Sequence, residues 1–179
     1  MSRKSKENRE CRKEKKEELK KEFLAVIEEM VEHPKVLQMK NFMQHGNTSC
    51  YQHCMNVAYY NYQICKRFGF DAKAAARGGL LHDMFLYDWH SHCPQKGEML
   101  HAFSHPIKAL QNAEKYFKLN AKEKDIIRCH MWPVTFFHMP RTRESWITVI
   151  TDKYCSMRET SMRWTQRKAA QTGLDMGVL

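Results

Sequence analysis

The sequence predicts an all-α protein. Apolar residues recur at spacings of three and four in several separate segments, which is the pattern of helices that bury one face. Residues typical of helix caps and stops separate these segments, and no stretch alternates polar and apolar residues for long enough to predict a strand. The 179 residues suit one compact domain. We therefore expect a bundle of about six to seven helices with a charged helical extension at its N-terminus.

We expect three regions: an extension (1–22), one domain (23–168) and a short tail (169–179). Residues 3–22 combine Lys, Arg and six glutamates with almost no apolar residue, so Glu–Lys pairs can support a helix that has no face to bury. We interpret this segment as a solvated helix or a frayed end. A basic arm for RNA or a membrane surface is the alternative, and the glutamates disfavour it.

Charge and cysteine content narrow the class of protein. The formal net charge of +10 is spread over both ends of the chain and not gathered in one aromatic-studded stripe, which disfavours nucleic-acid binding and favours a small anionic partner. Seven cysteines without a CxxC pair, and no apolar leader segment, predict a cytoplasmic protein. No stretch approaches the roughly 20 apolar residues of a membrane span, so no membrane is expected. A homo-oligomer stays open.

The first half of the domain is predicted to contain three helices. One apolar stripe starts the first of them: Phe23, Leu24, Ile27, Met30 and Val31. The second covers about residues 48–68 and ends at Gly69, with one inward face: His53, Val57, Tyr60 and Ile64. Asp71 caps the third, over about 72–83, in which Gly78 and Gly79 indicate close packing against a neighbouring backbone. Residues 84–103 are expected to form a loop.

The second half is predicted to contain three more helices. Pro106 fits the first turn of one that continues through Phe117, with His105 at its mouth. Asn120 and Glu123 form a capping box for the next, whose inward face ends at His130. Residues 131–140 are expected to be irregular. A last core helix spans about 143–163, with an apolar side (Trp146, Val149, Ile150 and Tyr154) close to Asp152.

Histidines and aspartates on these inward faces predict a metal centre. A buried ionised carboxylate is costly without a partner, and a divalent cation supplies one. Imidazole with carboxylate suits iron, manganese, zinc, nickel or cobalt, whereas a closed thiolate zinc site would need cysteine pairs that are absent. Six ligands exceed the need of one catalytic ion and suit two: His53, His82, Asp83, His105, His130 and Asp152.

The order and contexts of these residues resemble the HD-domain superfamily of metal-dependent phosphohydrolases, over about residues 45–160. The similar segments are GLLHD (79–83), SHPIKAL (104–110) and ITDKY (150–154). The resemblance implies an all-helical fold and a binuclear centre. In it His53, His82, Asp83 and Asp152 would hold one ion, Asp83 would bridge to a second, and His105 and His130 would complete that second site. Iron and manganese are favoured, and zinc, nickel, cobalt and magnesium stay open.

The resemblance does not define the substrate. Cyclic-dinucleotide phosphodiesterases of the superfamily carry adjacent histidines and a Gly-Tyr-Pro signature, whereas this chain has His130-Met131 and lacks the signature. Arg158, six residues after Asp152, is similar to an arginine of the hydrolases of diadenosine tetraphosphate, but Met131-Trp132-Pro133 departs from their Thr-Thr-Gly-like turn. We predict hydrolysis of a phosphoester or phosphoanhydride of a nucleotide or other small phosphorylated metabolite. The alternatives are a mixed-valent di-iron oxygenase on the same fold and a non-catalytic, metal-stabilised nucleotide sensor.

Further residues are candidates for contact with the substrate. Asp83 is the central catalytic ligand, and His101, four residues before His105, is predicted as a general acid or a substrate contact. Lys153, Arg158 and Trp132 are predicted to bind the substrate. Basic residues (Lys96, Arg141 and Arg143) are expected around the same mouth, and Tyr87 and Trp89 offer an aromatic wall. A loop cluster (His90, His92 and Cys93) lacks a fourth ligand at the regular spacing of a zinc site. A zinc site of Cys50, His53 and Cys54 would compete for His53, and the larger set of ligands is favoured over it.

Overall fold

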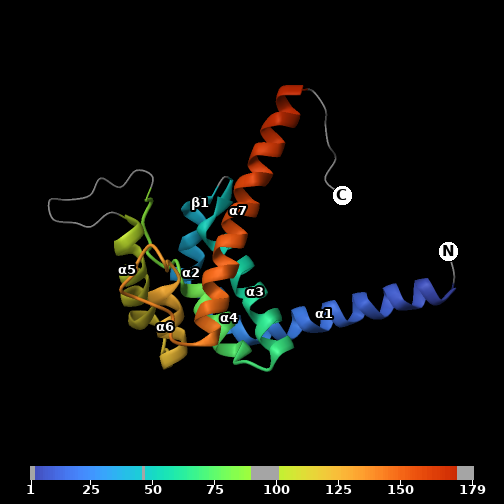
Figure 1. Ribbon diagram of the computed structural model, residues 1–179, viewed down its shortest axis with the longest axis horizontal. Coiled ribbons are helices and arrows are strands. Elements are labelled where there is room, and N and C mark those ends of the chain that lie inside the picture. Colours follow the sequence, from blue (N-terminus) through green and yellow to red (C-terminus); the bar gives the residue numbers. More distant parts are fainter. Residues whose placement is uncertain (1–2, 46, 90–100, 173–179) are drawn as a thin grey trace.

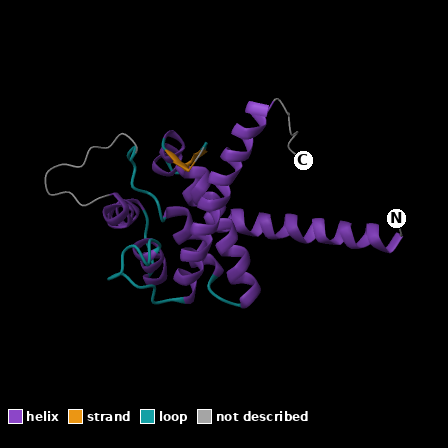
Figure 2. Cartoon of the chain, turned by 45° about the horizontal axis from the view of Figure 1, so that its top comes forward, coloured by secondary structure: helices purple, strands orange, loops and turns teal. Residues whose placement is uncertain are grey.

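The computed structural model describes residues 3–45, 47–89 and 101–172, and it is a helical bundle from which two long helices project (Figures 1 and 2). The described residues contain seven α-helices, which confirms the all-α prediction. The α-helices are α1 (Arg3–Val31), α2 (Pro34–Gln38), α3 (Cys50–Phe68), α4 (Ala72–Leu81), α5 (His101–Tyr116), α6 (Ala121–Cys129) and α7 (Arg143–Thr172). A 3-10 turn (Met39–Asn41) and two short strands, β1 (Met43–His45) and β2 (Thr48–Ser49), join α2 to α3.

Helix α1 unites the charged extension and the first core helix. It continues without a break from Arg3 to Val31, and its outer half leaves the body of the molecule (Figure 1). Only its last turns are buried, through Phe23, Ile27 and Met30. The apolar stripe therefore holds the helix against the bundle, while the Lys- and Glu-rich turns lie in solvent.

The segment before α3 differs from the prediction, which contained no strand and began the helix at Thr48. Here β1 and β2 pair antiparallel, with Met43 opposite Ser49. The Ser49 hydroxyl accepts a hydrogen bond from the Gln52 N–H and caps α3, so the helix begins at Cys50. Strands of two or three residues are too short to produce a recognisable alternation.

The two glycines of α4 allow close contact with different neighbours. A Cβ on Gly79 would lie 3.0 Å from the Cα of Ala58 in α3, and one on Gly78 would lie 2.8 Å from the Cγ2 of Ile126 in α6. The prediction of close packing against a neighbouring backbone is confirmed at Gly79, whereas Gly78 packs against a side chain. Around them lie fully buried Leu80, Leu81 and Ile127.

The inward faces of α3 and α7 are more polar than predicted. On α7 the expected apolar residues Ile150 and Tyr154 are 65% and 47% exposed, and Trp146 is 37% exposed. On α3, Asn61 is fully buried and replaces the half-buried Tyr60 and Ile64 as a central contact.

Asn61 explains this polar interface. Its amide nitrogen donates to the Thr148 hydroxyl at 2.9 Å, and its carbonyl oxygen accepts from the Thr151 hydroxyl at 2.5 Å. Buried polar groups that satisfy one another can replace an apolar contact, so α7 turns its Thr- and Asp-bearing side toward α3.

Three helix limits are informative. Helix α5 begins at His101, so Pro106 lies inside it and not in its first turn as predicted; near the start of a helix the proline forfeits a single hydrogen bond. The capping box of Asn120 and Glu123 is present at α6, as predicted. Helix α7 runs to Thr172, nine residues beyond its predicted end, because no glycine or proline interrupts it before Gly173. None of the described helices is both long and apolar enough to cross a membrane.

Candidate metal centre

Five helices bring the six predicted ligands together in the interior. His53 lies on the inner face of α3, and His82 and Asp83 follow the last turn of α4. The other three come from α5, α6 and α7: His105, which lies one turn into its helix, His130, which ends its helix, and Asp152. All six are buried, with at most 7% of any residue exposed.

One group of donors joins α3, α4 and α7. The Nε2 of His53 lies 3.0 Å from the Oδ1 of Asp152, and the Nε2 of His82 lies 3.6 Å from the same oxygen. Donor atoms of these three residues all lie within 4.8 Å of one another, which is the spacing of a set that can surround one cation.

A second group joins α4 and α6, and His105 of α5 lies beside it. It contains His82, Asp83 and His130, again with donor atoms within 4.8 Å. The Oδ1 of Asp83 is 3.3 Å from the Nε2 of both His105 and His130, and its Oδ2 is 3.4 Å from the Nε2 of His82. Asp83 thus faces ligands of both groups, and His82 belongs to both.

Main-chain carbonyl groups orient the imidazole rings of His82 and His130. The Nδ1 of His82 lies 2.8 Å from the carbonyl of Gly79, and the Nδ1 of His130 lies 2.9 Å from that of Ile127. These carbonyls can only accept, so each Nδ1 carries the proton and donates. Each Nε2 therefore carries the lone pair that faces the cluster and can bind a cation.

His53 is oriented by a side chain and not by its own helix. Its Nδ1 lies 2.9 Å from the Oε2 of Glu159, and the Asn56 amide donates to the other oxygen of Glu159 at 2.9 Å. Glu159 is 7% exposed and lies two helical turns beyond Asp152 on α7. The sequence prediction missed it, although a seven-residue spacing places both carboxylates on one helix face.

The imidazole rings lower the pKa values of both carboxylates in the cluster. In Asp152 burial favours the neutral acid, but hydrogen bonds to His53 and His82 outweigh burial and hold its pKa well below the usual range. The pKa of Asp83 is also well below its usual range, because the surrounding imidazoles, His82 foremost, outweigh burial. Both carboxylates are therefore ionised at neutral pH.

The pKa values of two of the imidazole rings shift in opposite directions. Burial lowers the pKa of His53, yet its hydrogen bonds to Asp152 and Glu159 reverse this and raise the pKa to about 10. In His130 burial prevails and lowers the pKa. A proton on His53 therefore balances Asp152, and any cation that binds competes with this proton.

The donor set fits divalent cations. Two buried polar atoms at its centre, the Nε2 of His82 and the Oδ1 of Asp83, have no hydrogen-bond partner among the described residues. In addition, the Nε2 atoms of His105 and His130 lie 2.9 Å apart, and two ring lone pairs at this distance need a cation or a proton between them. Unsatisfied buried groups are rare in proteins, and a metal ion would satisfy the first two atoms and replace the proton between the other two.

A cavity of about 330 Å³ opens onto these donors. Polar lining comes from the ligands Asp83, His105, His130 and Asp152, together with Gln44, Lys153 and Ser156. The remaining described lining is apolar: Trp89, Ala102, Met131 and Val134. The cavity is thus a small, largely apolar chamber with the metal-binding donors at one side.

The other candidate substrate residues lie in different places. Lys153 lines the cavity, whereas Arg158 donates to the Tyr60 hydroxyl and Trp132 packs edge-on against Trp146; neither lines the cavity. His101 begins α5, next to the cavity residue Ala102, but its side chain lies outside the described residues. The loop residues His90, His92, Cys93 and Lys96 are also outside them.

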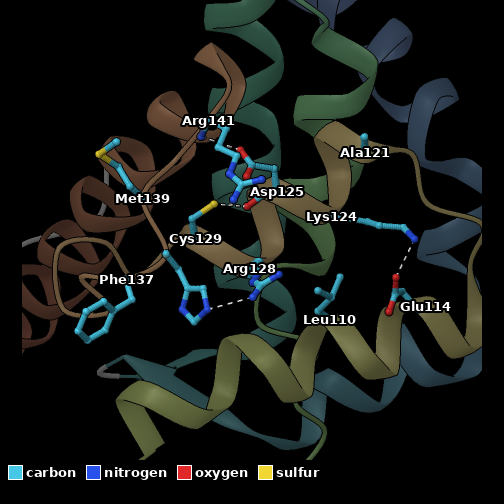
Figure 3. Close-up of a pocket in the computed structure, with 11 residues that line it drawn as sticks. Leu110, Glu114, Ala121, Lys124, Asp125, Arg128, Cys129, Phe137, Met139 and Arg141 are labelled. Carbon is cyan, nitrogen blue, oxygen red and sulfur yellow. Dashed lines mark hydrogen bonds and ion pairs between the residues drawn. The ribbon is translucent and has the colours of Figure 1, made fainter.

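The basic residues Arg141 and Arg143, which were expected at the mouth of the site, lie elsewhere. Arg143 lies over the Phe70 ring, at 5.1 Å from its centre. Arg141 lines a separate, larger hollow of about 750 Å³ between α5, α6 and the segment after α6 (Figure 3). Figure 3 shows Arg128 and Cys129 of α6 facing this hollow, whereas His130 ends the same helix at the metal centre.

Gln44 is a residue of the cavity that the sequence analysis missed. It comes from β1, is 7% exposed, and its Nε2 donates to the Oδ2 of Asp83 at 2.5 Å. Cys50 also contacts the same turn, because its thiol donates to the Asp83 carbonyl at 3.2 Å. No periodicity or motif marks Gln44, since it lies in a three-residue strand.

The fold and the site together define an all-α protein with a buried centre of histidine and aspartate donors. The family model of the HD domain matches residues 50–157, which is more than half of the chain, and the chain belongs to this family. The HD domain is the domain of a superfamily of metal-dependent phosphohydrolases, whose members bind divalent metals. Comparisons with curated proteins and with solved structures gave no match.

Proposed function

We propose that the protein is a metal-dependent phosphohydrolase that cleaves a phosphoester or phosphoanhydride of a small phosphorylated metabolite or nucleotide. The observation that carries this proposal is the pair of overlapping donor groups, which share His82 and open onto one cavity. Two such groups suit two divalent cations, with iron and manganese favoured. The substrate would be a small anion, and nucleic acid is not expected as a partner.

Lys153 supports a phosphorylated substrate. Among the described lining residues it is the one Lys or Arg of the cavity, and its ammonium group donates to the carbonyl of His130 at 3.3 Å. Burial lowers its pKa, and the neighbouring Asp152 offsets this only in part. We propose that this ammonium group binds the phosphoryl oxygens, while the apolar walls exclude water from the rest of the chamber.

The ligands and their supports have separate roles in the proposed reaction. When bound, the cations would neutralise phosphoryl charge and make a deprotonated water available at neutral pH. The chain's own part is to hold the six donors in place through Glu159 and the carbonyls behind the rings. His101 is our candidate for the general acid that protonates the leaving oxygen, and Arg158 and Trp132 remain candidates for contact with larger substrates.

The test is metal analysis of freshly purified protein, followed by turnover measurements in air and under nitrogen. The substrate panel contains mononucleotides, dinucleoside polyphosphates, small phosphomonoesters and phosphonates. We expect about two metal ions per chain and release of phosphate or a nucleotide at equal rates with and without oxygen.

Asp83→Ala is the control for contaminating phosphatases, because it removes the ligand that faces both donor groups. The variant should retain its helical circular dichroism spectrum and lose turnover. Turnover that requires oxygen would replace the proposal by the di-iron oxygenase. Nucleotide binding without any product would indicate the sensor.

A further inference from the structure

Gln44 occupies an unusual position for a neutral side chain. It lies in the short hairpin before α3, outside the segment 50–157 that matches the HD domain. It nevertheless lines the cavity beside the metal-binding donors and is 7% exposed. Its amide is therefore a fixed part of the chamber that the matched domain does not supply.

The orientation of this amide follows from its partner. The Oδ2 of Asp83 lies 2.5 Å away, and an ionised carboxylate can only accept hydrogen bonds. The NH₂ group of Gln44 must therefore face Asp83, because the reverse orientation would set two acceptors against each other. The carbonyl oxygen Oε1 is the free end of the amide.

This free end is an unsatisfied acceptor. The Oε1 of Gln44 is buried and has no hydrogen-bond partner among the described residues. A buried carbonyl without a donor costs roughly 1–3 kcal/mol, so it is expected to meet a donor in the working protein. The cavity that Gln44 lines is where a ligand could bring that donor.

We propose that Gln44 selects the substrate by accepting a hydrogen bond from it at Oε1. The substrate is then a small phosphomonoester that carries a hydroxyl or ammonium group close to its ester oxygen. The charged end would meet Lys153 and the metal-binding donors, and the donor group would meet Gln44. The 330 Å³ volume and the apolar remainder of the lining favour a short carbon chain. The phosphate group of this substrate rests on the proposed hydrolase function. The hydrogen bond to the Oε1 of Gln44 does not depend on that proposal.

The test uses phosphonates, which resist hydrolysis and so separate binding from turnover. Propylphosphonate, 3-hydroxypropylphosphonate and 3-aminopropylphosphonate share the same three-carbon chain and differ in its terminal substituent, which is hydrogen, hydroxyl or ammonium. Their dissociation constants are measured by calorimetry under nitrogen with the metal-loaded protein. We expect one of the donor-bearing probes to bind about tenfold more tightly than propylphosphonate, and the two arms tell hydroxyl from ammonium.

Gln44→Met keeps the length of the side chain and removes the amide. It should abolish the preference for the donor-bearing probe, while the affinity for propylphosphonate changes much less. If Gln44 served only to hold Asp83, all probes would weaken by the same factor and the proposal would fail. Gln111→Met, on the exposed side of α5, is the matched control and should bind every probe like the wild type.

Three further outcomes would test the Gln44 inference or the proposed hydrolase function. Equal affinity of the wild type for all three probes would overturn the inference without any variant, so it does not depend on the folding of Gln44→Met. Binding of none of them would overturn the assigned substrate class. A clear preference among the phosphonates, with no hydrolysis of the corresponding ethyl, 2-hydroxyethyl and 2-aminoethyl phosphates, would leave the Gln44 assignment standing and reject the proposed hydrolase.

Discussion

At the scale of single residues, the imidazoles differ in what holds them. His82 and His130 donate from Nδ1 to carbonyls of their own helices, which no side-chain substitution removes. His53 instead depends on Glu159, a side chain 106 residues later in the sequence. The orientation of the α3 ligand can therefore be disturbed by a single substitution elsewhere in the chain.

Glu159→Ala should weaken metal binding by about 10- to 100-fold, because His53 loses the acceptor that fixes its ring. Glu159→Gln should recover part of the affinity, since its amide oxygen can still accept from Nδ1. Competition with a fluorescent chelator measures both variants. Glu28→Ala, on the exposed side of α1, is the control and should change nothing. Equal affinities of the Ala variant and the wild type would show that Glu159 does not position His53.

The second donor group makes a separate prediction about stoichiometry. His130→Ala removes a ring at the end of α6 that faces Asp83 and His105, but it leaves the His53 and Asp152 side of the cluster intact. We expect the metal content to fall from about two ions per chain to one, as measured by elemental analysis, and His105→Ala to act in the same direction. If both variants kept the wild-type content, the centre would not be binuclear in the proposed way.

At the scale of helices, the position of His82 and Asp83 is set by how closely α4 approaches its neighbours. The approach to α3 has no slack at Gly79, because an added Cβ would meet main-chain atoms of Ala58 and the Nδ2 of Asn61 at 2.7 Å. Main-chain atoms of a packed helix cannot move aside as a flexible side chain can. Any widening at Gly79 would also strain the Asn61 hydrogen bonds to α7.

Gly79→Ala should therefore lower the free energy of unfolding by about 2 kcal/mol, despite the better helix propensity of alanine. Urea unfolding followed by circular dichroism measures the change. Lys73→Ala, on the exposed side of the same helix, should stay within about 0.5 kcal/mol of the wild type. A neutral or stabilising effect of Gly79→Ala would mean that α4 can move away from α3 at little cost.

Glu144 links the starts of three helices and predicts a dependence on pH. Its Oε1 accepts from the Asp71 N–H at 2.9 Å and from the Lys122 ammonium at 2.9 Å. Burial raises the pKa of Glu144, but these hydrogen bonds outweigh burial and lower it below 4.5. A lowered pKa in the folded state stabilises the protein above the unfolded value near 4.5 and loses this effect as the pH falls further.

The unfolding free energy of the wild type should thus fall more steeply below pH 4.5 than that of Glu144→Gln, which has no charge to lose. Urea unfolding at pH 7, 5, 4 and 3.5 tests this. The variant should already be less stable at pH 7, where its amide cannot replace the ionised carboxylate. Parallel curves for the two proteins would contradict the role of Glu144.

The helices also show what a sequence can and cannot reveal. The inward helix faces, together with the resemblance to the HD-domain superfamily, predicted that His53, His82-Asp83, His105, His130 and Asp152 meet in the interior. The inward face of α7 was predicted only in part: Val149 and Asp152 are buried, but Trp146 and Ile150, which would make a more apolar stripe, are exposed. That choice depends on Asn61, whose hydrogen bonds to Thr148 and Thr151 exist only after α3 and α7 pack together.

At the scale of the whole molecule, the folding unit is larger than the family match. Residues 50–157 exclude the buried side chains of α1 and the segment after it: Phe23, Ile27, Met30, Val36 and Met39. They also exclude Gln44 and Glu159, which act on the metal-binding donors. The sequence analysis missed both residues. A glutamine in a three-residue strand carries no signal, and the seven-residue spacing of Glu159 from Asp152 is easily passed over on a long charged helix.

The donors also tie together distant parts of the chain, from α3 to α7, so bound metal should stabilise the whole fold. At a free metal concentration of 100 times the dissociation constant, the gain is about 2.7 kcal/mol. Removal of metal with a chelator should therefore lower the melting temperature by roughly 5–10 °C, as followed by circular dichroism. The melting temperature of Asp83→Ala should respond little to the chelator. A chelator effect of the same size in that variant would show that the stabilising ion binds elsewhere.

The projecting outer half of α1 gives the protein the hydrodynamics of an elongated particle. About fifteen residues of helix add an arm roughly 22 Å long, and α7 extends in a different direction (Figure 1). Such arms increase friction far more than they increase mass. A monomer would elute from a sizing column at the volume of a larger sphere and could be mistaken for a dimer. Its subunit number should therefore be taken from light scattering or sedimentation equilibrium, which weigh the particle without reference to its shape.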